Sequence, residues 1–241
     1  MLPTSLSNVD LRRFNLQISD DTIGIDGQEK LRYSQVVVQG LEGIGIATMR
    51  CLLASGIGEV IVIDDGVITE KMLPSQTLFG ISDVGKLRCI AAREKLIGGM
   101  FGNSLQLYNT KLSEGNMDRL LGNAKVLVKT TWGPKFHHDM LDIMDKRDLT
   151  MVGGFGVGWK GVFGTYSGNN KDGFRELFTN IYLRNIDIFS EEHICFSHVS
   201  NVIGGALASI TIKTLLNMDN VIPDSDFYQV DLLNLNFEKC L

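Results

Sequence analysis

The chain has 241 residues, 44% of them hydrophobic, and a formal net charge of −5 at pH 7. This length favours one large domain, and the hydrophobic content exceeds that of disordered chains. The negative charge argues against wholesale binding to nucleic acid or anionic membranes. No run reaches the roughly twenty apolar residues of a membrane span, and Met1–Asp10 lacks a secretory pattern. We therefore expect an intracellular protein.

The first half of the chain alternates between predicted helices and strands. Residues 1–20 are mostly polar and predict an arm followed by a short helix at Leu11–Ile18. A second helix, two buried strands and the helices that connect them follow, with consecutive β-branched residues marking the strands. These elements are expected at Asp26–Ser34 (helix), Val36–Gly40 (strand), Ile44–Ala54 (helix), Glu59–Asp65 (strand) and Asp83–Leu96 (helix).

The alternation continues and then changes in the C-terminal third. Strands are expected at Ser104–Leu112, Ala124–Thr131 and 149–156, with helices at 116–123 and Lys135–Asp148 between them. Trp159–Gly168 and residues 176–189 then read as strands without intervening helices, before an apolar helix at Asn201–Met218 and a final strand at Asp226–Asn234. The pattern predicts a Rossmann-like, doubly wound and mostly parallel sheet, extended by antiparallel strands.

A glycine-rich turn joins the first predicted strand to its helix. Gly40, Gly43 and Gly45 form G-x-x-G-x-G, and such a turn at a helix N-terminus can bind an anion. Its spacing is not that of the G-x-G-x-x-G dinucleotide motif. An NAD-dependent oxidoreductase is therefore only a weak third hypothesis for the function. Glu42 lies inside the turn, and a like charge about 4 Å from a phosphate costs about 1–4 kcal/mol. Asp64 ends the next strand, where related folds bind a ribose hydroxyl, although a solvated acid is equally expected there.

Other reactive residue types are scattered. The four cysteines show no metal-ligand or disulfide spacing, so reduced thiols are expected. His137 and His138 are adjacent in a predicted helix and therefore point to different faces, which argues against a metal pair. His193 and His198 flank Cys195, but a structural cysteine is favoured over a nucleophile. Trp132 and Trp159 are expected to fill core or interface space.

An ordered series of segments resembles the ubiquitin-like-protein activating enzymes and their bacterial relatives of the ThiF/MoeB/HesA type. The segments are RFNLQI, GIDGQEKL, VVVQGLEGIG, ASGIGEVIVIDD, LPSQTLF, DVGKLRCIAAREKL and IGGALASITIK, which together cover most of the chain from about Arg12. The resemblance implies one ThiF-type adenylation domain over residues 1–241, with residues 1–20 as an N-terminal arm and helix. Active members of the family use ATP and magnesium to adenylate the C-terminal glycine of a modifier.

The chain departs from the active pattern D-x-D-x-V-x-x-x-N-x-x-R-Q. Gly66 replaces the second aspartate, Met72 the asparagine and Ser75 the arginine, whereas Gln76 and, further on, Lys86 match. In a second signature, D-x-T-D-N, the two acids are replaced by Lys129 and Trp132. Without acids nothing obvious binds magnesium, and without the arginine the charge on the phosphate is not neutralised.

These losses resemble the inactive half of a heterodimeric activating enzyme, closest to the Aos-type regulatory subunit of the SUMO-activating enzyme. We therefore expect a non-catalytic subunit, a pseudoenzyme with no catalytic residue or metal site of its own, in nucleus and cytoplasm. Its catalytic partner would bind ATP and Mg, and the modifier would join through the complex. Gly40, Gly43, Gly45, Asp64, Gln76 and Lys86 are then remnants of nucleotide binding. The alternative is a divergent homodimeric ThiF/MoeB-like adenylyltransferase acting on a sulfur carrier or modifier protein.

One N-terminal position bears on that partnership. The resemblance implies an arginine, in a Y/F-D/N-R-Q motif, that reaches the ATP site of the partner. Here the motif reads Phe14-Asn15-Leu16-Gln17, so leucine replaces the arginine. Arg13 is the candidate substitute, with Arg12 as its neighbour, and a plain surface arginine is the competing interpretation. A shift of one helical position turns a side chain by about 100°.

Overall fold

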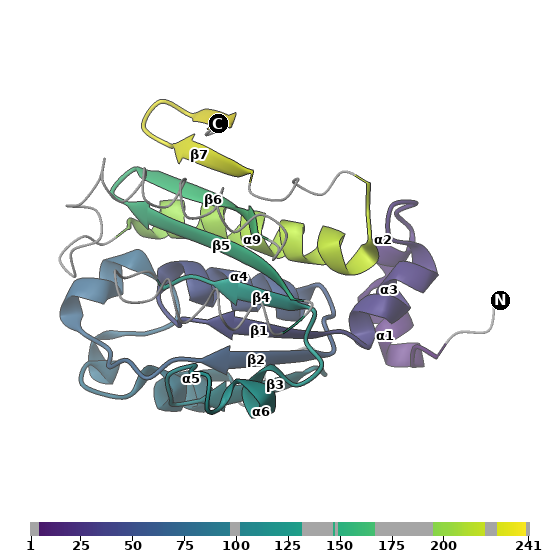
Figure 1. Cartoon of the computed structure of the whole chain (residues 1–241), viewed down its shortest axis with the longest axis horizontal. Helices are drawn as coiled ribbons and strands as arrows, with labels where there is room; N and C mark the ends of the chain where they lie inside the picture. The colour runs from purple at the N-terminus through teal and green to yellow at the C-terminus, as the bar shows by residue number, and fades with distance from the viewer. Residues whose placement is uncertain are drawn as a thin grey trace.

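The fold is built around one mixed β-sheet (Figure 1). The computed structural model describes residues 5–96, 102–131, 147, 149–166, 195–219 and 226–239. Within them the strand order is β3-β2-β1-β4-β5-β6-β7-β8. The strands are β1 (Gln35–Gln39), β2 (Glu59–Ile63), β3 (Ser104–Tyr108), β4 (Val126–Lys129), β5 (Thr150–Val157), β6 (Lys160–Tyr166), β7 (Phe227–Asp231) and β8 (Asn236–Lys239). The pairs from β3 to β5 are parallel and those from β5 to β8 antiparallel, which confirms the predicted sheet.

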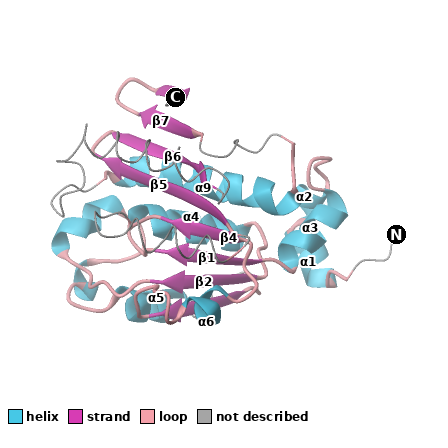
Figure 2. Cartoon of the chain, in the orientation of Figure 1, coloured by secondary structure: helices cyan, strands magenta, loops and turns pink. Residues whose placement is uncertain are grey.

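Helices cover both faces of this sheet (Figure 2). They are α1 (Asn8–Arg13), α2 (Asn15–Ile18), α3 (Gly24–Arg32), α4 (Gly43–Ala54), α5 (Arg88–Leu96), α6 (Met117–Leu121) and α9 (Ser197–Leu216), with 3-10 turns η1 (Glu70–Ser75) and η2 (Ile81–Asp83). Buried residues of α4, α5 and α9 pack in one hydrophobic cluster, and those of α6 in a second. The helices α1 to α3 gather at the end of the sheet where the parallel strands begin.

Alternation along the strands divides the core between the two faces. Val36 and Val38 of β1 belong to the cluster with α4 and α9, whereas Val37 between them belongs to the cluster with α6. All three are fully buried. Burying such a side chain stabilises the fold by about 1.5–3 kcal/mol, so β1 contributes to both sides of the core. This is why its sequence is a continuous β-branched run.

The helix α9 is the central helix of the larger cluster. A Cβ on its Gly204 would lie 2.5 Å from the Cβ of Ala47, so α4 and α9 cross closely. The helix ends at Asn217, whose left-handed φ of 57° closes the last turn. By length and composition α9 alone among the described helices could cross a membrane, but half of it is buried inside the protein. We interpret it as a core helix.

The predicted helix Leu11–Ile18 is two helices in the structure. Chain direction changes at Phe14, which is 3% exposed and has φ −101° and ψ 18°. The first helix, α1, begins earlier than predicted because Ser7 caps it and exchanges hydrogen bonds with Asp10. Burial of one aromatic ring at the join therefore overrides the continuous helical pattern.

The predicted helix Asp83–Leu96 begins only at Arg88, as α5. In place of its expected first turn, the chain finishes the 3-10 turn η2 at Asp83, turns at residues 84–86 and pairs with the segment after β2. Val67 and Leu87 form an antiparallel bridge, and the N–H of Ile68 donates to the carbonyl of Lys86. Gly85 has φ +88°, which ends helical geometry there. Apolar spacing alone could not distinguish the two conformations.

The predicted last strand, Asp226–Asn234, is followed by one more. The strand β7 stops at Asp231, whose carboxylate accepts hydrogen bonds from the N–H groups of Leu233 and Asn234. This turn leads into β8, whose residues are all exposed. The helix expected at Lys135–Asp148 and the strand expected at 176–189 lie outside the described residues, apart from Arg147.

Candidate functional site

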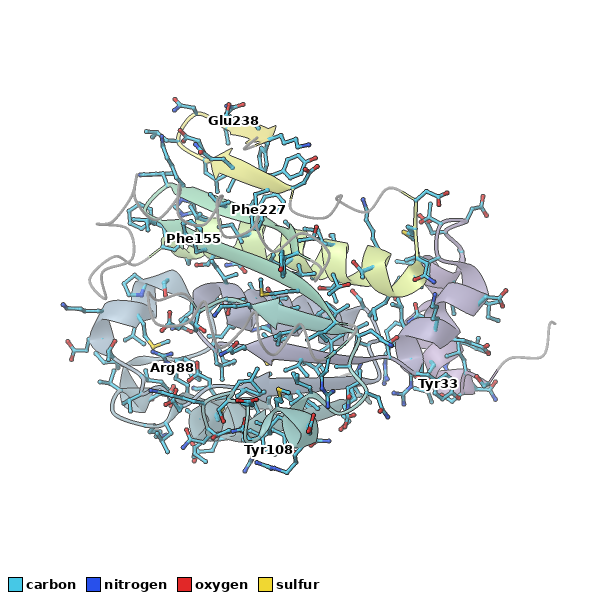
Figure 3. All side chains as sticks on the ribbon, viewed as in Figure 1. Tyr33, Arg88, Tyr108, Phe155, Phe227 and Glu238 are labelled. Carbon is cyan, nitrogen blue, oxygen red and sulfur yellow. The ribbon has the colours of Figure 1, made fainter. Side chains whose placement is uncertain are left out.

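The glycine turn lies where the parallel strands end. Strand β1 stops at Gln39, and residues 40–42 connect it to α4. Figure 3 shows Arg88 at this end of the sheet and Tyr33, just before β1, at the other. Open α/β sheets bind ligands at the carboxyl ends of their strands, so this edge is the candidate site.

Each glycine of the turn is required by packing. Gly40 has φ +104°, a left-handed conformation that other residues rarely adopt. A Cβ at Gly43 would overlap the carbonyl oxygen of Ser75 and lie 2.5 Å from the hydroxyl oxygen of Ser200. A Cβ at Gly45 would overlap the carbonyl oxygen of Gly40. The motif is therefore explained by contacts within the chain, whether or not a nucleotide binds.

Asp64 is held in place from both sides of the turn. One carboxylate oxygen accepts a hydrogen bond from the N–H of Leu41 at 2.7 Å, and the other from the N–H of Gly66 at 2.8 Å. Asp64 is 6% exposed. These bonds join the end of β2 to the glycine turn, and they use both oxygens of the acid that related folds offer to a ribose.

Arg88 pairs with the acids at the glycine turn, and the sequence analysis did not single it out. Its Nη1 lies 3.2 Å from Oδ2 of Asp64, and its Nη2 lies 2.8 Å from Oε1 of Glu42. Its guanidinium lies over Gly66, where a Cβ would be 2.6 Å from Cζ. The loss of a side chain at Gly66 makes this placement possible. The sequence signal that could have pointed to Arg88 was Gly66, which stands where the resemblance expects an acid.

Two residues match the active motifs, Lys86 and Gln76. The side chains of both make their contacts away from the glycine turn. The ammonium of Lys86 lies 3.4 Å from Asp83 and 3.2 Å from Glu94, and these partners raise its pKa, Glu94 most. The side-chain amide of Gln76 donates to the carbonyls of Leu73 and Phe79 and accepts from the N–H of Phe79. Gln76 thus fixes the loop after η1, and Arg88 is the cation that reaches the turn.

The described residues of this edge do not fit a magnesium ion. Both oxygens of Asp64 are bonded and the carboxylate of Glu42 is paired with Arg88. Lys129, where the resemblance expects an acid, is 1% exposed and donates to the carbonyl of Thr131. Burial lowers its pKa well below the usual value. No group of three acidic, histidine or cysteine ligands exists among the described residues.

The N-terminal arginines lie away from the glycine turn. Both belong to α1, at the opposite end of the sheet (Figure 1). Arg12 and Arg13 are exposed, and a Cβ at Gly102 would lie 3.0 Å from Nη1 of Arg13. Arg13 therefore takes no part in the site of its own chain, and its role toward a partner stays a prediction.

Of the residues around Cys195 that the structure describes, none forms a catalytic pair with it. Cys195 is 7% exposed, and burial raises the pKa of its thiol to about 11, so it stays protonated near neutrality. The ring of His198 instead contacts Trp159, with centroids 4.7 Å apart. Trp159 is 43% exposed and so is not a core residue, contrary to one of the two predictions for it. Trp132, His137, His138 and His193 lie outside the described residues.

The described cysteines are free thiols, as predicted. Cys51 is exposed, whereas Cys89 and Cys195 are buried. Burial raises the pKa of Cys89 to about 12, and its thiol donates to the carbonyl of Asp64 at 3.2 Å. Neither buried thiol is a candidate nucleophile.

Comparison with known proteins gives a family match over nearly the whole chain. A model of the ThiF family matches residues 14–241. The adenylyltransferase and sulfurtransferase UBA4 of Eremothecium gossypii is 31% identical over 171 residues, covering 70% of this chain and 38% of that protein. The probable molybdopterin-synthase adenylyltransferase of Porphyra purpurea is 22% identical over 241 residues, covering 98% of this chain and 62% of that protein. The chain thus spans less than two thirds of the length of either relative.

Solved structures agree on the fold. The crystal structure of PaaA has a TM-score of 0.78 at 18% identity and covers 99% of this chain and 85% of its own. The crystal structure of E. coli MccB with ATP has a TM-score of 0.75 at 21% identity and covers 97% and 71%. These findings support the superfamily that the sequence resembles. They do not support the expected SUMO-type subunit, since the named relatives are adenylyltransferases.

Proposed function

Because the chain belongs to the ThiF family, we propose that it is a divergent ThiF/MoeB-like adenylyltransferase acting on a sulfur carrier or modifier protein. Such a reaction joins a carboxylate oxygen of the carrier to the α-phosphorus of ATP and releases pyrophosphate. The relatives named as adenylyltransferases support this function over the non-catalytic one.

The observation that carries the proposal is the position of Arg88. Its side chain is 14% exposed and lies between Glu42, the N-cap residue of α4, and Asp64, which follows β2. When Glu42 turns aside, this cation beside a helix N-terminus would attract the phosphates of a nucleotide, in the role that the resemblance gives to the arginine missing at Ser75. Gly40, Gly43 and Gly45 keep the turn close enough for backbone N–H groups to meet the ligand. No step is assigned to a metal ion, since the described residues do not fit one.

Exchange of labelled pyrophosphate into ATP tests the proposal. The purified chain, given Mg·ATP and a candidate carrier, should support exchange, and Arg88→Ala should reduce it about a hundredfold or more. Arg119→Ala is the control and should keep full exchange. Arg119 belongs to α6, where it lies over the ring of Tyr108 of β3, and α6 packs on the face of the sheet opposite α4. Absence of exchange with every carrier, by a folded wild-type chain, contradicts the proposal.

A second function is favoured by the replaced residues. Gly66, Ser75 and Lys129 occupy positions where the resemblance expects two acids and an arginine, and Glu42 neutralises Arg88. These features suit a non-catalytic subunit of a heterodimeric, SUMO-type activating enzyme. Its partner would bind ATP and Mg, Arg13 would face that partner, and the complex would act in nucleus and cytoplasm.

The two functions differ in whether the chain alone or only its complex with a partner supports pyrophosphate exchange. A non-catalytic subunit should show no exchange alone and should co-purify from its own cells with an equimolar partner. Exchange would then appear only in the complex, and it would survive Arg88→Ala. An adenylyltransferase should exchange alone and lose exchange in that variant.

A further inference from the structure

Arg88 joins two carboxylates that differ in exposure. Its Nη1 faces Asp64 at 3.2 Å and its Nη2 faces Glu42 at 2.8 Å. The side chain of Asp64 is 3% exposed and that of Arg88 14%, whereas that of Glu42 is 49% exposed. We call these three residues the clasp. Its formal charge is −1, so the cation at the glycine turn is already more than neutralised.

The clasp lies where a phosphate would approach α4. Glu42 is the N-cap residue of α4, but its side chain makes no capping hydrogen bond, since it binds Arg88 instead. Asp64 also accepts from the N–H of Leu41 in the same turn. An anion bound at the first turn of α4 would therefore meet the carboxylate of Glu42 directly.

Glu42 is the member of the clasp that can move. The backbone N–H of Arg88 donates to the carbonyl of Gly66, and its guanidinium lies over that glycine. Its Nε is buried and has no hydrogen-bond partner among the described residues. Asp64 is buried and bonded to two backbone N–H groups. Half-exposed Glu42, in contrast, can turn toward solvent when a ligand takes its place at Nη2.

We propose that Glu42 acts as an internal competitor that sets how many phosphate groups the glycine turn accepts. This inference rests on the proposed function, because it assumes that a nucleotide binds at this turn. The repulsion between Glu42 and a ligand grows with ligand charge. Glu42 should therefore oppose ATP and ADP most, AMP less and adenosine hardly at all.

Titration calorimetry with a series of adenine ligands tests the proposal. Adenosine, AMP, ADP and ATP are titrated into wild type and Glu42→Gln, with a chelator present so that no metal changes the ligand charge. The affinity of the variant for ATP should be at least about tenfold higher than that of wild type. Its affinity for AMP should rise by a smaller factor, and its affinity for adenosine should stay within about twofold. The gain for ATP should shrink at high salt. If Glu42→Gln does not fold, Glu42→Ser carries the same comparison, because serine can cap α4.

Glu238→Gln on β8 is the matched control. It makes the same change in net charge at the far edge of the sheet, as Figure 3 shows, and it should leave all four affinities unchanged. An equal gain for adenosine and ATP, or no gain for ATP, overturns the role of Glu42 and leaves the proposed function standing. If neither wild type nor Glu42→Gln binds any of the four ligands, the role of Glu42 fails, and exchange with Mg·ATP still decides the proposed function.

Discussion

At the residue scale, two helical glycines predict opposite effects of alanine. A Cβ at Gly43 would overlap the carbonyl oxygen of Ser75, whereas a Cβ at Gly205 on α9 would meet nothing within 4 Å. Gly43→Ala should lower the free energy of unfolding by about 1–3 kcal/mol, because the buried loop must move. Gly205→Ala should raise it by about 0.5–1 kcal/mol, because alanine restricts the unfolded chain. Urea denaturation of both variants measures the difference. A neutral Gly43→Ala would show that the loop after η1 yields easily.

Asp83 predicts a loss of stability in acid. The side chain of Lys95, followed by the N–H of Gly80 and by Lys86, lowers the pKa of Asp83 from 3.8 to about 2. The folded state therefore binds this proton more weakly than the unfolded state does. The stabilisation is present above pH 3.8 and is lost as the pH falls toward 2. The midpoint of thermal unfolding should fall less steeply across this range in Asp83→Asn than in wild type. Parallel curves for the two proteins would contradict this assignment.

The clasp shows which residues of the site the sequence could predict. Glu42 was singled out because a charge inside a glycine turn is visible in the sequence itself. Arg88 was not, because its two partners lie 24 and 46 positions earlier and the fold alone brings them together. The match at Lys86 drew attention to the neighbouring cation, which binds Asp83 and Glu94 instead. Side-chain type predicts local chemistry, but the direction of a long side chain depends on its surroundings.

At the element scale, two leucines separate the core helix from the C-terminal hairpin. Leu207 of α9 is fully buried, whereas Leu235, between β7 and β8, is 79% exposed. Leu207→Ala should lower the free energy of unfolding by about 2–5 kcal/mol, since it leaves a cavity. Leu235→Ala should change it by less than about 0.5 kcal/mol. Comparable losses in chemical denaturation would mean that the hairpin packs on part of the chain outside the described residues.

The predicted elements were most accurate where burial alone decides them. Strands β1, β2 and β4 lie within the predicted ranges or extend one residue beyond them, because buried runs rich in β-branched residues have few other conformations available. The errors occur where one contact overrides a pattern. Phe14 interrupts one helix, and the bridge between Val67 and Leu87 delays the start of another to Arg88. Such contacts join positions that no local period relates.

At the scale of the whole molecule, the sheet makes the two hydrophobic clusters dependent on each other. Leu207 lies in the cluster with α4 and α9, and Leu120 of α6 lies in the other. Strand β1 supplies Val36 and Val38 to the first and Val37 to the second. If the strands shared by the two clusters unfold, the buried residues of both clusters become exposed. The molecule should therefore unfold as one cooperative unit.

Truncation on either face should therefore shift a single transition. Leu207→Ala and Leu120→Ala, both at fully buried positions, should each lower the urea midpoint, with circular dichroism and tryptophan fluorescence giving the same midpoint within each variant. The slope of the free energy against urea should match that of wild type, because the same surface is exposed on unfolding. If Leu120→Ala produced an early transition seen by one probe only, the face covered by α6 would be a separate folding unit. The helices α4 and α9 would then hold the glycine turn in place without it.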